Sequence, residues 1–200
     1  MQRIVETLRE ASSETGTGLY VGCGNGRNYL PLVDAGLDLV GLDVSPEAIR
    51  RLVERRPSLV AGRLVCDDFL GWAPARPLFD YVIALQVFQH GGDADVGAYL
   101  AKVGALIRPG GLFFLRVNSA TTQIYHAHTV VERNGLGGLT VRYDEGPKRG
   151  MLIHFFSGLE LHERLMPLFH PVLEPQEDVT VRAAPKTGSW AQWETIWTRR

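Results

Sequence analysis

The chain has 200 residues, of which 45% are hydrophobic, and a formal net charge of -1 at pH 7. This length fits one well-buried domain and excludes two large ones, and the near-neutral charge excludes a global basic field for nucleic acid. We find neither a signal-peptide pattern nor an apolar run of membrane length. The two cysteines, Cys23 and Cys66, fall at expected strand ends in the core, so we expect free thiols and a cytoplasmic protein.

A short amphipathic helix is expected within the first 15 residues. Ile4, Val5 and Leu8 share one helical face, and charged residues occupy the other. Such a leader helix could lie near a ligand or simply cover the sheet, and the sequence leaves both possibilities open.

Glycines at alternate positions follow the first apolar run. Residues 19–21 predict a buried strand, and residues 27–35 predict a helix that ends at Gly36. Between them, Gly22, Gly24 and Gly26 allow a sharp turn at positive φ and leave bare main chain for a ligand to approach. The pattern therefore predicts a strand, a tight ligand-binding turn and a helix.

An acidic residue follows the second apolar run. Residues 37–42 predict a strand that ends in Asp43, about 20 residues beyond the glycines, where nucleotide-binding α/β folds place the acid that holds a ribose. Ser45 and Pro46 then begin a helix, because serine caps helices and proline fits the first helical position.

The segments VGCGNGRN at 21–28 and VGLDVSPEAI at 40–49 resemble motif I and the acidic loop of the class I S-adenosylmethionine-dependent methyltransferases. The dinucleotide-dehydrogenase fingerprint requires glycine or alanine three residues after its second glycine, and Arg27 stands there. The spacing therefore favours the methyltransferase. One departure is Tyr20, because the family usually has an acidic residue there that braces the glycine loop.

The resemblance implies S-adenosylmethionine as cofactor and S-adenosylhomocysteine as product. In the family's third motif it makes Asp68 the acceptor from the adenine amine and puts Phe69 beside the ring, whereas an alignment one residue earlier would choose Asp67. The implied cofactor-binding residues are Gly22, Cys23, Gly24, Asn25, Gly26, Arg27, Asn28, Asp43, Val44, Asp67, Asp68, Phe69, Leu85 and Gln86.

Three more strands and a helix are expected in the middle of the chain. Residues 63–66 and the apolar run 78–85 predict strands, the second covered on both faces. A helix from Asp93 to Arg108, a turn at residues 109–111 and a strand at 112–117 follow. Because sites lie at the carboxyl ends of such strands, residues 84–90 should face the methyl group, with His90 among them.

The pattern loosens from residue 118 to residue 150, where many glycines surround two strand-like pieces at 129–132 and 139–143. We expect a cap insertion with a hairpin that selects the methyl acceptor. If the acceptor must lose a proton, the candidates for a base are His90, Tyr125, His126 and His128. Two alternating histidines without a carboxylate or thiolate set do not make a zinc site, so no metal is expected.

The last third of the chain predicts an apolar run at 151–156, a helix that begins at Ser157, and two strands at 169–181 and 189–198. We expect one α/β domain over residues 1–200, with a Rossmann-like, doubly wound, seven-stranded mixed sheet whose last strand is antiparallel. The predicted function is in-line methyl transfer to a small molecule by a monomer or homodimer, without nucleic-acid or membrane partners. The alternative is an inactive S-adenosylmethionine-binding regulatory or interaction protein.

Overall fold

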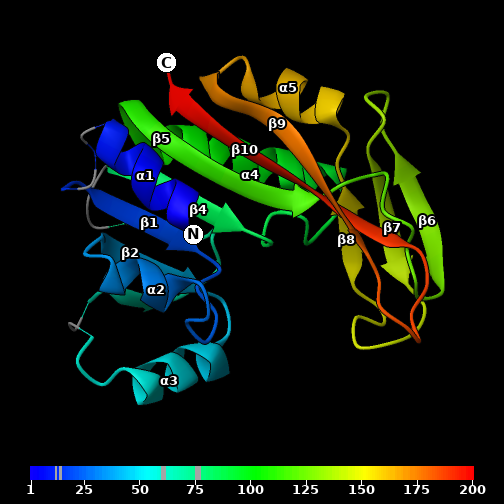
Figure 1. The fold of residues 1–200 in the computed structure, drawn as a ribbon, viewed down its shortest axis with the longest axis horizontal. Helices are drawn as coiled ribbons and strands as arrows, with labels where there is room; N and C mark the ends of the chain where they lie inside the picture. Colours follow the sequence, from blue (N-terminus) through cyan, green and yellow to red (C-terminus); the bar gives the residue numbers. More distant parts are fainter. Residues whose placement is uncertain (12, 14, 60–61, 75–77) are drawn as a thin grey trace.

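The computed structural model describes residues 1–200 apart from 12, 14, 60, 61 and 75–77. Seven strands form its main sheet in the order β3-β2-β1-β4-β5-β10-β9 (Figure 1). Neighbours from β3 to β5 are parallel, and β10 runs antiparallel to both β5 and β9. This confirms the predicted mixed sheet. The strands are β1 Thr17–Val21, β2 Asp38–Asp43, β3 Leu64–Cys66, β4 Phe79–Leu85, β5 Ile107–Asn118, β9 Phe169–Val181 and β10 Ser189–Arg199.

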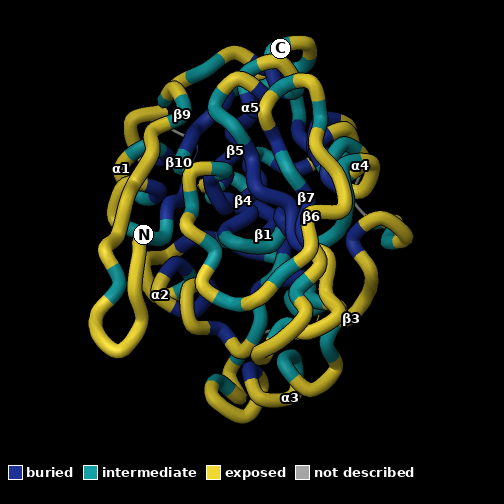
Figure 2. Tube along the Cα trace, turned by 90° about the vertical axis from the view of Figure 1, so that its right-hand side faces the viewer, coloured by how far each residue is buried: buried dark blue, intermediate teal, exposed yellow. Residues whose placement is uncertain are grey.

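Helices cover the sheet on both faces. α1 Gln2–Glu10, α2 Tyr29–Asp34 and α3 Pro46–Arg55 share one buried apolar cluster with the sheet, and α4 Asp93–Leu106 and α5 Gly158–Leu165 share another. Strand β4 supplies Tyr81 and Ile83 to the first cluster and Val82 and Ala84 to the second, as the twofold period of a strand requires. Figure 2 shows the central strands as the buried interior. The doubly wound fold is confirmed.

Local signals fixed several boundaries. The Ser45 hydroxyl accepts a hydrogen bond from the Ala48 amide at 3.2 Å, and the Ser157 hydroxyl accepts one from the Glu160 amide at 2.9 Å. Both serines therefore cap helices as expected. Two boundaries differ from the prediction. Helix α2 begins two residues late, at Tyr29, because the glycine turn precedes it, and α4 ends at Leu106 because the Pro-Gly-Gly segment is an irregular part of β5.

A second, three-stranded antiparallel sheet lies beside one end of the main sheet, in the order β6-β7-β8 (Figure 1). Its strands are β6 His128–Arg133, β7 Leu139–Tyr143 and β8 Leu152–Phe155. The predicted hairpin of residues 129–132 and 139–143 is present as β6 and β7. The third strand, β8, lies wholly beyond residue 150, the predicted end of the insertion, and pairs with β7. We call β6, β7 and β8 the cap sheet.

The two cysteines differ in their surroundings. Cys23 is buried, and burial raises the pKa of its thiol to about 12. Cys66 is exposed, so its expected place in the core is wrong: it ends β3, which is the edge strand of the main sheet. Among the described residues, no helix combines the length and the apolar character needed to cross a bilayer.

Candidate functional site

A cavity of about 440 Å³ opens at the carboxyl ends of the parallel strands. The chain order reverses there, since β1 pairs with β2 on one side and with β4 on the other, and ligands of open α/β sheets bind at such a point. The volume suits a small molecule. Its lining residues are Val21, Gly22, Leu42, Asp43, Val44, Asp67, Asp68, Phe69, Gln86, Val87, Phe88, His90, Tyr99 and Met151.

The three glycines after β1 all adopt positive φ, as the sequence predicts, with values of 72° at Gly22, 53° at Gly24 and 87° at Gly26. A Cβ at Gly22 would lie 2.8 Å from a methyl carbon of Val87 in the cavity wall, and one at Gly26 would lie 2.4 Å from Leu52. A Cβ at Gly24 would meet nothing within 4 Å. Close packing therefore excludes side chains at the first and third positions, and conformation alone favours glycine at the second.

Asp43 connects the glycine loop to helix α3. One carboxylate oxygen accepts a hydrogen bond from the Gly24 amide at 2.7 Å, and the other accepts one from the Ser45 amide at 2.9 Å. The loop is thus braced from β2. Tyr20 takes no part in this brace, because it is buried edge-to-face against Tyr29 and burial raises the pKa of its phenol well above the usual range.

An acidic turn follows β3 and forms the next part of the wall. Asp67, Asp68 and Phe69 all line the cavity, as the resemblance implies. Asp67 accepts a hydrogen bond from the Asp68 amide at 2.8 Å, and Asp68 accepts one from the Gly71 amide at 2.9 Å. Both residues line the cavity, so the choice between them for the adenine amine stays a prediction.

A further part of the wall follows β4. Gln86 has a φ of 61°, which is rare for a residue with a side chain, and its side-chain amide donates to Gln192 at 3.0 Å. Such a backbone conformation persists where surrounding contacts hold it, often beside functional sites. Phe88 is buried and stacks on Tyr99, with ring centroids 5.1 Å apart and planes 14° apart. This part of the wall therefore combines a hydrogen-bonded glutamine with two stacked aromatic rings.

His90 lies at the end of this wall, and its side chain is half-buried. Burial lowers the pKa of the imidazole, and the positive charge of Lys148 lowers it further. At neutral pH the ring is therefore uncharged and can accept a proton. Burial also lowers the pKa of the Lys148 ammonium. The backbone carbonyl of Lys148 accepts a hydrogen bond from the Met151 amide at 2.9 Å.

The other candidates for a base lie outside this cavity. His126 is 3.6 Å from the Glu145 carboxylate, and the His128 ring contacts the His126 carbonyl at 2.9 Å. Tyr125 is exposed and lines a separate shallow pocket with Gln123 and Ile124 among its neighbours. Of the predicted cofactor residues, those that do not line the cavity are Cys23, Gly24, Asn25, Gly26, Arg27, Asn28 and Leu85.

Three of the lining residues were not named as site residues from the sequence. Phe88, Tyr99 and Met151 come from the loop after β4, from α4 and from the residue before β8. Tyr99 and Met151 reach the cavity only through tertiary packing, and no local pattern marks them. Phe88 lies within the predicted site segment 84–90 and could have been named from its position.

The sequence of this chain is similar to those of known methyltransferases. Residues 19–113, just under half of the chain, match the family described as "Methyltransferase domain". A ubiquinone biosynthesis O-methyltransferase from Azorhizobium caulinodans is 34% identical over 111 residues, which are 54% of this chain and 42% of that protein. The chain thus spans less than half the length of the curated relatives it matches first.

Solved structures share the fold over nearly the whole chain. A Methanosarcina mazei S-adenosylmethionine-dependent methyltransferase has a TM-score of 0.72 at 18% identity and covers 96% of both chains. A Burkholderia thailandensis 1,6-didemethyltoxoflavin-N1-methyltransferase, solved with S-adenosylhomocysteine, has a TM-score of 0.65 at 21% identity over 99% of this chain and 77% of that one. Residues 19–113 are thus similar to a methyltransferase domain, and the chain shares the fold of solved S-adenosylmethionine-dependent methyltransferases.

Proposed function

We propose that this chain transfers a methyl group from S-adenosylmethionine to a small-molecule acceptor. The observation that carries the proposal is the glycine loop held by Asp43 at the wall of a 440 Å³ cavity, at the point where the sheet reverses its order. The cavity fits the cofactor's chemistry, because carboxylates for hydroxyl and amine groups lie beside aromatic faces for a base.

The cofactor would lie against one end of the cavity. Gly22, Asp43 and Val44 would hold the ribose and amino-acid parts, and Asp67, Asp68 and Phe69 would hold the adenine, with Gln86 near the reacting end. The predicted cofactor residues that do not line the cavity are residues 23–28 and Leu85. Residues 23–28 would form the glycine loop, and Leu85 would support the end of β4. When bound, S-adenosylmethionine supplies a methyl group made electrophilic by its sulfonium. The residues of this chain then need to align the acceptor and exclude water.

The acceptor would occupy the part of the cavity lined by His90 and Met151, whereas Phe88 and Tyr99 pack against Phe69 on the adenine side. A neutral imidazole at His90 can take the proton of an acceptor hydroxyl, and a hydroxyl oxygen is the first acceptor atom to test because relatives are named O-methyltransferases. We further propose one domain over residues 1–200, in which the insertion 118–150 selects the acceptor. The protein would be a cytoplasmic monomer or homodimer that does not act on nucleic acid.

The first prediction concerns cofactor identity. Titration calorimetry should show binding of S-adenosylmethionine and S-adenosylhomocysteine and no binding of NADH, because Arg27 replaces the third glycine of the dinucleotide fingerprint. Tight binding of NADH, with no binding of S-adenosylmethionine or S-adenosylhomocysteine, would refute the proposal. Mass spectrometry across a panel of hydroxylated metabolites then separates an enzyme from a regulatory protein that binds the cofactor without turnover.

The second prediction concerns Asp43→Ala. The variant should remain folded and bind S-adenosylhomocysteine about 10- to 100-fold more weakly, because it loses charge-assisted hydrogen bonds to the ligand and the brace on the Gly24 amide. Asp38→Ala is the matched control. Asp38 begins the same strand, contacts Thr17 and Arg63, and does not line the cavity, so its loss should leave affinity unchanged. If Asp43→Ala binds S-adenosylhomocysteine as tightly as Asp38→Ala and the wild type do, Asp43 is not part of the cofactor site.

A further inference from the structure

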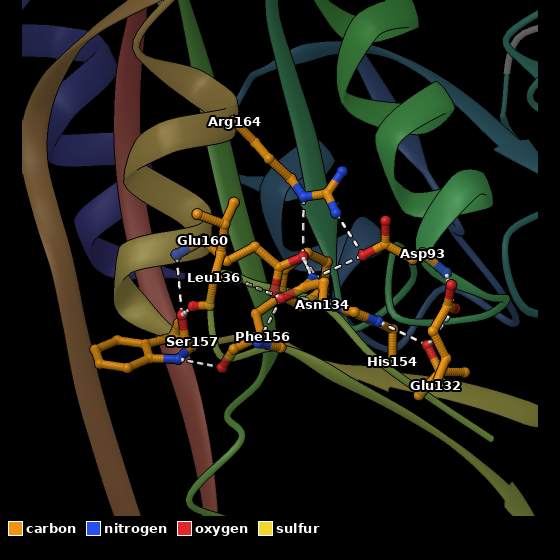
Figure 3. A network of polar contacts seen from close by, with 12 residues as sticks. Asp93, Glu132, Asn134, Leu136, His154, Phe156, Ser157, Glu160 and Arg164 are labelled. Carbon is orange, nitrogen blue, oxygen red and sulfur yellow. Dashed lines mark hydrogen bonds and ion pairs between the residues drawn. The ribbon is translucent and has the colours of Figure 1, made fainter. Parts of the chain in front are cut away.

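A buried cluster of polar side chains lies outside the cavity, between the cap sheet and helices α4 and α5 (Figure 3). His154 of β8 and Glu160 of α5 are 1% and 0% exposed. Two titratable groups buried this deeply need hydrogen-bond partners, and the proposed reaction does not use either of them.

Glu160 receives donors from three directions. His154 Nε2 lies 3.0 and 3.1 Å from its two carboxylate oxygens, so this nitrogen carries a hydrogen. Arg164 Nε donates to Glu160 at 2.9 Å, and the Asn134 side-chain amide donates at 2.8 Å. The same Arg164 and Asn134 side chains also donate to Asp93 at 2.5 and 2.7 Å.

The other side of the His154 ring continues the network into the cap sheet. His154 Nδ1 lies 2.9 Å from the Thr140 hydroxyl, which lies 3.4 Å from the Glu132 carboxylate. Glu132 in turn accepts a hydrogen bond from the Asp93 amide at 3.0 Å. The network thus joins β6, β7 and β8 to the first residue of α4 and to α5.

The cluster resembles a cation site in composition, since ligand atoms of Asp93, His154 and Glu160 all lie within 4.8 Å of one another. Its carboxylates, however, already receive the Arg164 guanidinium and the Asn134 amide. A metal ion would have to displace these donors. The arrangement is therefore that of a satisfied buried network that fixes the position of packed elements.

The strand that carries His154 also holds the segment around His90. The His154 amide donates to the Gln89 carbonyl at 2.8 Å, and the Gly91 amide donates to the Leu152 carbonyl at 3.0 Å. His90 itself forms an antiparallel bridge with Ile153. Strand β8 therefore holds the backbone of three consecutive residues, Gln89, His90 and Gly91.

We propose that Glu160 and His154 are positioning residues that anchor β8 and thereby hold His90 in its partly desolvated place at the end of the cavity. The role of His90 beside the methyl acceptor rests on the proposed function. The placement of His90 does not depend on it.

The test compares Glu160→Gln with Val103→Ala, a core substitution in α4 that makes no contact with the network's hydrogen bonds. The readout is the titration of the His90 imidazole by NMR, assigned by the signal that disappears in His90→Gln. In the wild type the pKa of His90 should lie below its ordinary value of about 6.5. In Glu160→Gln it should rise toward that value, because a loosened β8 admits water, and the Gly91 amide should exchange faster.

Val103→Ala should lower the melting temperature and leave the His90 titration unchanged, which separates positioning from general stability. Thr140→Val, which removes the hydroxyl beside His154 Nδ1, is a milder second variant and should shift the His90 titration in the same direction. If Glu160→Gln or Thr140→Val folds with reduced stability and an unchanged His90 titration, the proposal is wrong. S-adenosylhomocysteine binding to the wild type, measured separately, tests the proposed function, so the two failures are distinguishable.

Discussion

Replacing residues 128–143, the β6-β7 hairpin, with a four-residue Gly-Ser linker should preserve S-adenosylhomocysteine binding and strongly reduce methyl transfer. The Asp144 amide donates to the Ala127 carbonyl at 2.9 Å, so the ends of the excised segment are adjacent and a short linker can join them. The proposed cofactor residues belong to the loops after β1, β2 and β3 and to the end of β4, which Gln86 follows directly, and the excision removes none of them. Affinity should therefore stay within a few-fold of the wild type.

Turnover should fall by at least about 100-fold, the effect of misplacing reacting groups by about 1 Å. Without the hairpin, β8 loses its pairing with β7, and the buried network loses Glu132, Asn134 and Thr140. Met151 and His90 would then no longer have fixed places at the end of the cavity.

The matched control replaces the exposed turn 183–187 between β9 and β10 with a Gly-Ser segment of equal length. That turn lies outside the cavity, so both cofactor binding and turnover should be retained. Activity can be measured by mass spectrometry on any acceptor that the wild type methylates. A folded hairpin-deleted chain with full activity and the same acceptor preference would show that the cap sheet does not select the acceptor.

The fold could be predicted where local signals and burial agree. The apolar run 78–85 became β4, which is buried on both faces, and the serines at 45 and 157 became helix caps. These features depend on residues close together in the sequence. The Pro-Gly-Gly segment was predicted less well, because Ile107 before it and Leu112 after it both pair with β4, so that the segment is an irregularity within a strand and not a turn that ends one.

The site was predictable only in part, and the reason is the range of the contacts. Asp43 was recognised by its distance from the glycines, but its bonds to the Gly24 and Ser45 amides come from the packing of two strand ends. His154 and Glu160 lie in an apolar run and a helix start, and their burial depends on Asn134 from the β6-β7 turn and on Arg164, one turn after Glu160 in α5. A histidine within the apolar run 151–156 was the one local sign of this network.

Replacing His90 with glutamine should lower turnover by about 10²- to 10⁴-fold, the usual contribution of a general base, if the acceptor gives up a proton. Burial and the charge of Lys148 both lower the pKa of the imidazole, so the neutral base is present at neutral pH. Activity of the wild type should therefore fall as the pH drops through a value below 6.5, where the ring becomes protonated.

The pH profile distinguishes a base from a group that only fills space. His90→Gln should lose the acid limb of the profile, and Lys148→Met should move that limb to higher pH, because removing a nearby positive charge makes the imidazole easier to protonate. His126→Gln is the control, since His126 lies outside the cavity and should leave rate and profile unchanged. If His90→Gln keeps the wild-type acid limb, the limb belongs to another group. The residues around His90 would then contribute mainly by aligning the acceptor with the methyl group.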